Sequence, residues 1–157
     1  MKCFCVLDGF FSFKSEFMSC GSLLFKDTSK WLEKPDNYTI KLYFPNNTIP
    51  KEYEIDLNSF TIIEENFPTG IYTVEVTICD KTYKKQFLNI CKLECALSNM
   101  LANLSFCEQN EEKIKEAKKY KLWIDSLKAK FNCEIIDIKE IKEIVSYLKD
   151  KLGECAC

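Results

Sequence analysis

The sequence predicts an α+β protein, in which an N-terminal antiparallel, Ig-like β-sandwich (residues 20–88) precedes a C-terminal three-helix bundle or helical hairpin (residues 89–157). Apolar residues recur with a period of two up to about residue 88 and with a period near 3.6 after it, which distinguishes strands from helices. No linker rich in Gly, Pro or Ser separates the halves, so we expect the last strand to run directly into the first helix. Residues 1–19 precede both patterns and form a separate N-terminal segment.

Four strands are predicted from the alternation. The segments NYTIKLYF, EYEIDL, GIYTVEVTI and KTYKKQF carry an apolar or aromatic residue at nearly every second position. Turn residues separate them, including Asn46 and the PTG segment at 68–70. Short strands with frequent turns indicate an antiparallel sandwich. The residues expected to point inward are Tyr38, Ile40, Leu42, Phe44, Tyr53, Ile55, Leu57, Tyr72, Val74, Val76, Ile78, Tyr83 and Phe87.

An immunoglobulin domain has a Cys, Trp, Cys series, and Cys20, Trp31 and Cys79 repeat that order. However, Trp31 stands in SKWLEKP, which is typical of a short helical turn, and Thr77 occupies the position of the tyrosine that precedes the second cysteine by two. We therefore expect Ig-like architecture without a true Ig domain.

Three helices are predicted after residue 88. The first follows Cys91, the second spans about 111–131, and the third begins after Asp137. Asp137 is an N-cap residue, Glu140 completes a capping-box pattern, and Gly153 ends the helix. The predicted apolar stripes are Leu93, Leu97, Met100, Leu101 and Leu104; Ala117, Tyr120, Ile124, Leu127 and Phe131; and Ile138, Ile141, Ile144, Val145, Leu148 and Leu152.

Composition narrows the classes of function. The net charge of −2 and the lack of any arginine argue against specific nucleic-acid binding. The chain also lacks histidine, the commonest general base and metal ligand. No apolar run approaches the ~18 residues of a membrane-spanning helix, so we expect no membrane partner. We predict that the protein is not an enzyme and has no catalytic or cofactor-binding residues.

The ten cysteines leave three interpretations open. Cys91 and Cys95, one helical turn apart, could be small buried residues that pack closely. They could bind zinc together with Cys133, because the second helix returns toward the start of the first. Zinc is therefore the one cofactor left open. They could also form a disulfide after cell lysis. Cys107 lies ~24 Å along the first helix, where we expect Cys155 and Cys157.

A helical wheel places small residues opposite the leucines of the first helix. Cys91, Cys95, Ser98 and Ala102 share this face. A helix with one bulky and one small face is often packed between two layers. We therefore predict that these four residues pack against the sandwich or another subunit.

The segments KDTSKWLEKPDNYTIKLYFP and FPTGIYTVEVTI, followed by a helical region that opens with CKLECAL and closes with CAC, resemble small virion structural proteins of crAss-like bacteriophages. The resemblance covers the chain from about Cys20 onward. It implies a non-enzymatic ring or collar subunit of the neck or tail, with partners that include itself and portal, neck or tail components. It also implies location in the virion, after synthesis in the host bacterial cytoplasm. The alternatives are a zinc-stabilised intracellular adaptor and a capsid decoration protein.

Overall fold

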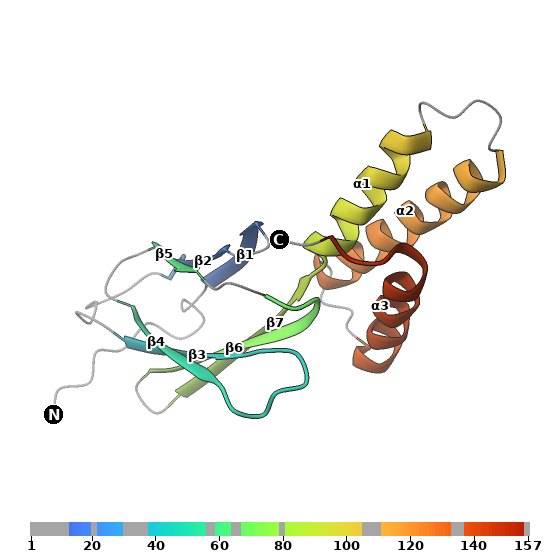
Figure 1. The fold of residues 1–157 in the computed structure, drawn as a ribbon. Helices are drawn as coiled ribbons and strands as arrows, with labels where there is room; N and C mark the ends of the chain where they lie inside the picture. The colour runs from blue at the N-terminus through green and yellow to red at the C-terminus, as the bar shows by residue number, and fades with distance from the viewer. Residues whose placement is uncertain are drawn as a thin grey trace, which may run out of the picture. The chain divides into compact units, whose positions relative to one another are not determined.

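The computed structural model describes residues 13–19, 22–29, 38–55, 59–63, 67–78, 81–104, 111–132 and 137–155. The chain divides into two compact units, Met1–Asn89 and Ile90–Cys157. All described strands belong to the first unit and all described helices to the second (Figure 1). The predicted α+β class, with antiparallel sheets followed by three helices, is confirmed.

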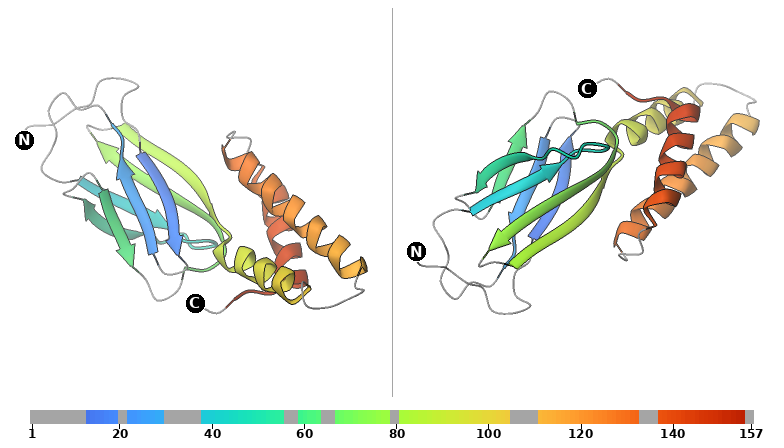
Figure 2. Two further views of the ribbon diagram at one scale, coloured as in Figure 1. Left: turned by 90° about the horizontal axis from the view of Figure 1, so that it is seen from above. Right: turned by 90° about the horizontal axis from the view of Figure 1, so that it is seen from below.

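The first unit contains two antiparallel sheets, which form two layers (Figures 1 and 2). One sheet has the order β1-β2-β5 and the other the order β4-β3-β6-β7. The strands of the first sheet are β1 (Phe13–Ser19), β2 (Ser22–Asp27) and β5 (Ser59–Ile63). Those of the second are β3 (Tyr38–Tyr43), β4 (Lys51–Ile55), β6 (Gly70–Ile78) and β7 (Lys81–Asn89).

Both sheets bury their apolar faces in a single core, as the alternation predicted for β3 and β6. The residues predicted to point inward on those two strands are buried. They are Tyr38, Ile40 and Leu42 of β3 and Tyr72, Val74, Val76 and Ile78 of β6. On β7, Phe87 is buried and Tyr83 is half-buried. The core cluster combines both sheets: Phe13, Leu23, Phe25, Tyr38, Ile40, Leu42, Ile62, Phe67, Tyr72, Val74, Val76, Ile78 and Phe87.

Three strands were not predicted from the sequence. Strand β1 lies within residues 1–19, which were expected to form a separate segment, and it pairs with β2. Polar residues at inward positions hide the pattern, since Ser15 follows Phe13 on the same side of β1 and Asp27 is a buried residue of β2. Strand β5 has only five residues. Leu57 and the three residues of the immunoglobulin cue (Cys20, Trp31 and Cys79) lie outside the described residues.

A tight corner leads into β6. Gly70 has a φ of 148°, a conformation that residues with a Cβ rarely adopt, and an added Cβ would lie 2.8 Å from the Pro45 side chain. Two residues later, the Tyr72 hydroxyl donates a 2.6 Å hydrogen bond to the Pro68 carbonyl. The side-chain amide of Asn89, at the end of β7, donates from Nδ2 to the Phe67 carbonyl at 3.0 Å. The corner thus fixes where β6 enters the sheet.

One buried polar contact joins the two sheets. Asp27 ends β2 and Tyr38 begins β3, and the Tyr38 hydroxyl donates to Asp27 Oδ2 at 2.7 Å. The backbone N–H of Ser29 donates to Asp27 Oδ1 at 2.8 Å. Burial raises the pKa of Tyr38, and the hydrogen bond and negative charge of Asp27 raise it further.

The second unit contains α1 (Cys91–Leu104), α2 (Glu111–Asn132) and α3 (Ile138–Leu152), as predicted. Asp137 caps α3 by accepting a hydrogen bond from the Glu140 N–H, and Gly153 ends the helix. The Glu140 carboxylate pairs with Lys130 of α2, so only half of the predicted capping box is present. The buried residues of this unit are Ile90, Leu93, Leu97, Ala117, Tyr120, Ile124, Leu127, Ile141, Ile144, Val145 and Leu148.

Among the residues of the predicted apolar stripes whose side chains the structure describes, two are exposed. Leu101 is 42% exposed and Ile138 is 40% exposed. Leu101 lies in the C-terminal half of α1, whereas the buried leucines of the stripe, Leu93 and Leu97, lie in its first half. The expectation that the whole leucine stripe is buried was therefore wrong for Leu101.

We predict that Tyr38→Phe lowers the free energy of unfolding by about 1–3 kcal/mol, because it removes a buried hydrogen bond to a carboxylate. The native state holds the Tyr38 proton more tightly than the unfolded chain, so this stabilisation is present below about pH 10 and is lost as the pH rises further. Denaturant titrations at neutral and alkaline pH should show that the free energy of unfolding falls less between these pH values for Tyr38→Phe than for the wild type. The control is Tyr43→Phe, at the other end of β3. Equal stability of Tyr38→Phe and wild type would contradict the role of this contact.

Candidate functional site

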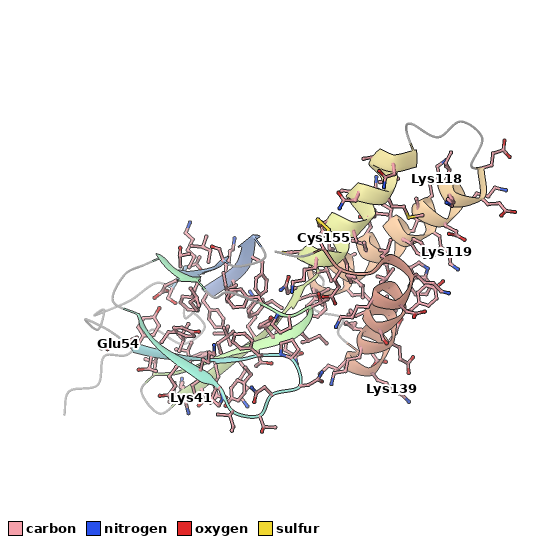
Figure 3. The ribbon with its side chains drawn as sticks, viewed as in Figure 1. Lys41, Glu54, Lys118, Lys119, Lys139 and Cys155 are labelled. Carbon is pink, nitrogen blue, oxygen red and sulfur yellow. A yellow bond between two sulfur atoms is a disulfide. The ribbon has the colours of Figure 1, made fainter. Side chains whose placement is uncertain are left out.

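The cysteine face of α1 is joined covalently to the C-terminal tail. Cys95 and Cys155 form a disulfide, with their Cα atoms 6.0 Å apart and a sequence separation of 60 (Figure 3). The Asn99 side chain, one turn after Cys95, donates to Cys155 Sγ at 3.4 Å. One of the three interpretations of the cysteines, a disulfide, is therefore present in the structure.

The tail reaches α1 because the chain turns at the end of α3. The Gly153 N–H donates to the Lys149 carbonyl at 2.9 Å, with Gly153 at a φ of 72°. The Cys155 N–H then donates to the Lys92 carbonyl at 3.3 Å, in the first turn of α1. This turn brings Cys155 to the first half of α1, and the expected neighbour Cys107 cannot be compared with it. Cys107 and Cys157 themselves lie outside the described residues.

Cys91 lies one turn before Cys95 and is half-buried. Burial raises the pKa of its thiol, and the nearby Glu94 carboxylate raises it further. The carboxylate itself pairs with Lys128 of α2 at 2.9 Å. A raised thiol pKa lowers the fraction of thiolate at neutral pH, and the thiolate is both the nucleophile and the metal ligand. The surroundings of Cys91 therefore favour a structural thiol over a reactive one.

The structure places the three predicted metal ligands differently. Cys91 and Cys95 share one face of α1, but Cys95 contributes its sulfur to the disulfide, and a zinc site needs a thiolate. Cys133 lies outside the described residues. Within the part of the chain that is described, no three Cys, Asp or Glu residues form a group that could hold a metal ion. Zinc binding by the reduced protein stays a prediction.

The predicted packing face of α1 divides into two parts. Cys91 and Cys95 are half-buried, whereas Ser98 and Ala102, further along the helix, are exposed within this chain. In the first part, Cys95 is bonded to the C-terminal tail, which also contacts the Lys92 carbonyl. The second part has the small side chains that permit close approach of another backbone, and its contact with another subunit stays a prediction.

A second surface of the helical unit combines aromatic rings with lysines. Trp123 of α2 and Tyr147 of α3 lie with their ring centroids 6.1 Å apart, and Trp123 is 37% exposed. The Lys119 ammonium lies 5.6 Å from the Tyr147 ring centroid and donates to its hydroxyl at 3.3 Å. The Lys151 ammonium lies 6.0 Å from the same ring. We call these four residues the Trp123 surface.

Sequence reasoning missed the Trp123 surface. Neither Trp123 nor Tyr147 lies on the predicted stripe of its helix, so both were left on faces treated as solvated. The signal was an aromatic residue at the border of each apolar stripe, where it can meet the neighbouring helix. A shallow hollow adjoins this surface along α3, between Lys139 and Asp150.

No protein-family model matches the chain, and no curated protein matches it. Among solved structures, an FN3 domain of human collagen XX is similar at 15% sequence identity and a TM-score of 0.41. The match covers 54% of this chain and 97% of that domain. None of the described helices has both the length and the apolar character needed to span a membrane.

We expect the disulfide to stabilise the helical unit by about 2–4 kcal/mol, because it closes a long loop of the unfolded chain. Cys155→Ser and reduction of the wild type should lower the melting temperature equally, and reduction should change Cys155→Ser little. Cys91→Ser is the matched control, since it removes a thiol from the same face of α1. Thermal unfolding with and without reductant measures this. A melting temperature that responds to neither change would show that the tail adds no stability.

We also predict that Ala102→Trp impairs stability or self-association more than Lys118→Trp on the lysine face of α2. Overpacking a close contact typically costs about 1–3 kcal/mol. Because Ala102 is exposed within the chain, the loss should appear mainly as lost oligomer in sedimentation. Unchanged melting and unchanged sedimentation for Ala102→Trp would mean that this face simply meets solvent.

Proposed function

We propose that this protein is a non-enzymatic structural component of a bacteriophage particle, a ring or collar subunit of the neck or tail that acts through protein–protein contacts. The observation that supports protein binding most directly is the Trp123 surface. Its Trp and Tyr rings are the side chains that contribute most often to the energetic centres of protein interfaces. The ammonium groups of Lys119 and Lys151 contact the Tyr147 ring and restrict its side-chain conformations, so less side-chain entropy is lost on binding.

The fold that we propose for the first unit is an Ig-like sandwich. Its strands follow an Ig-type order, in which β1, β2 and β5 form one sheet and β3, β6 and β7 form the other. The fourth strand, β4, extends the second sheet beside β3. Tyr72 supplies a tyrosine corner, because its hydroxyl bonds to a carbonyl four residues upstream at the start of β6. We propose a three-helix bundle for the second unit.

The chemistry of the cysteine face is consistent with a structural role. The Cys95–Cys155 disulfide joins the segment after α3 to α1, and the raised pKa of Cys91 disfavours its thiolate. A capsid decoration protein would use the same fold at another place in the particle. A zinc-stabilised adaptor would instead require the reduced cysteines to bind metal.

The proposal predicts that the chain is present at a fixed copy ratio to the major capsid protein in particles of the phage that encodes it. Quantitative mass spectrometry of gradient-purified particles measures this ratio. In complemented particles, Trp123→Ala should lower incorporation several-fold because it removes the aromatic anchor, whereas Lys118→Ala on the lysine face should not.

The position within the particle separates the remaining alternatives. Cross-linking to portal, neck or tail proteins would support the ring or collar assignment, and cross-linking to the capsid lattice would favour decoration. Absence of the chain from particles, together with stoichiometric zinc in the reduced protein, would replace the proposal with the adaptor.

A further inference from the structure

The outer face of the four-stranded sheet carries a transverse row of alternating charges. Strand pairing places Glu52 of β4 opposite Lys41 of β3, Lys41 opposite Glu75 of β6, and Glu75 opposite Lys84 of β7. The Lys84 ammonium lies 3.5 Å from the Glu75 carboxylate. The row therefore begins with an acidic residue at one edge of the sheet and ends with a basic residue at the other.

The two edges of this sheet differ in charge along the outer face. Among the described strands, β4 and β7 are the outermost, and each has one neighbour in the sheet. The outward positions of β4 are Glu52 and Glu54, and both are exposed. Figure 3 labels Glu54 on this strand. The outward positions of β7 include Thr82, Lys84 and Gln86, and the Lys84 side chain is 65% exposed. One edge is thus acidic and the other is basic.

These charges discriminate between the ways in which two copies could pair. Pairing β4 with β4 would bring Glu52 and Glu54 against the same residues of the other copy, and pairing β7 with β7 would bring Lys84 close to Lys84. Like charges placed opposite each other destabilise a strand pair. Pairing β4 of one copy with β7 of the next places opposite charges together. The β4–β7 pairing is therefore specific for two reasons, because its own charges attract and because the charges in the β4–β4 and β7–β7 pairings repel.

Strand direction permits the same pairing. All neighbours in the sheet are antiparallel, so across four strands β4 and β7 run in opposite directions. A second copy in the same orientation would therefore meet β7 with an antiparallel β4. Such a head-to-tail contact leaves one unused edge on each end of the pair and can be repeated into a ring or a filament.

The inward residues select a register. Lys85 is on the inner side of β7, where its ammonium donates to the Phe13 carbonyl at 3.2 Å, and the Lys51 ammonium of β4 lies 5.0 Å from the Phe44 ring centroid. If Lys84 faces Glu54 of the next copy, Gln86 faces Glu52 and Lys85 faces Tyr53. A shift of two residues would instead place Lys85 against Lys51, which like-charge repulsion disfavours.

We propose that the acidic β4 edge of this protein binds the basic β7 edge of a second copy, so that the four-stranded sheets continue from one copy to the next. The partner is thus another copy of this chain, joined by backbone hydrogen bonds and selected by Glu52, Glu54 and Lys84. The proposal names the partner for the assembly role above and rests on that role only for its biological setting.

Sedimentation velocity of the full-length chain in reducing buffer tests this contact. The wild type should self-associate in a concentration-dependent way, more weakly at high salt. The double variant Glu52→Lys with Glu54→Lys, and separately Lys84→Glu, should each weaken association at least about tenfold. The matched controls, Asp125→Lys and Lys118→Glu on α2, should associate like the wild type.

Mixing gives the decisive result. The double variant has two basic edges and Lys84→Glu has two acidic edges, so a mixture should recover association in alternating copies although each variant alone remains monomeric. Recovery also shows that both variants are folded. If Lys84→Glu fails to fold, Lys84→Gln should still weaken association. The proposal fails if the wild type is monomeric, if edge variants and controls associate alike, or if the mixture of folded variants stays monomeric.

The outcome is separable from that of the proposed function. Edge-dependent association of a protein absent from particles would remove the virion role and keep the contact. Normal incorporation of both edge variants into particles would keep the virion role and remove the contact.

Discussion

The first unit depends on the packing of Tyr72 at the start of β6. Its ring lies within 5.1–5.6 Å, centroid to centroid, of Phe17 from β1, Phe44 after β3 and Phe87 from β7, and so joins both sheets. The ring can occupy this position because its hydroxyl, which would be costly to bury alone, is satisfied by the Pro68 carbonyl. Tyr72 is paired with Phe87 of β7 in the same register that places Glu75 between Lys41 and Lys84.

Much of the fold could be predicted because the spacing of apolar residues alone distinguishes strands from helices. The inward face of β6 and the cap of α3 at Asp137 followed from spacing and residue type. Strands β1 and β2 could not be predicted in this way, since Ser15 and Asp27 occupy inward positions. The buried Asp27 is compensated by Tyr38 and the Ser29 N–H, and these partners become neighbours only once both sheets have formed.

The candidate site was less predictable, because it depends on the direction that the chain takes after its last helix. The wheel of α1 placed Cys91 and Cys95 on one face, but it could not say which segment would cover them. Gly153 allows the turn that returns Cys155 to the first half of α1, and a glycine marks only that a helix ends. The Trp123 surface shows the same limit, since it requires the relative rotation of α2 and α3.

The charges on the four-stranded sheet meet two demands that usually conflict. An exposed edge strand must resist unwanted pairing, and charged residues provide that protection. Because the two edges carry opposite charges, β4–β4 and β7–β7 pairings remain unfavourable, whereas the β4–β7 pairing is favourable. Such a contact is weak by itself, because β4 has only five residues and exposed ion pairs contribute about 0–1 kcal/mol each. A closed ring is nevertheless more stable than an open chain of the same copies, since the contact that closes the ring is effectively intramolecular. The Trp123 surface offers a separate attachment to other proteins, so edge pairing between copies and anchoring to a neighbour can be strengthened independently.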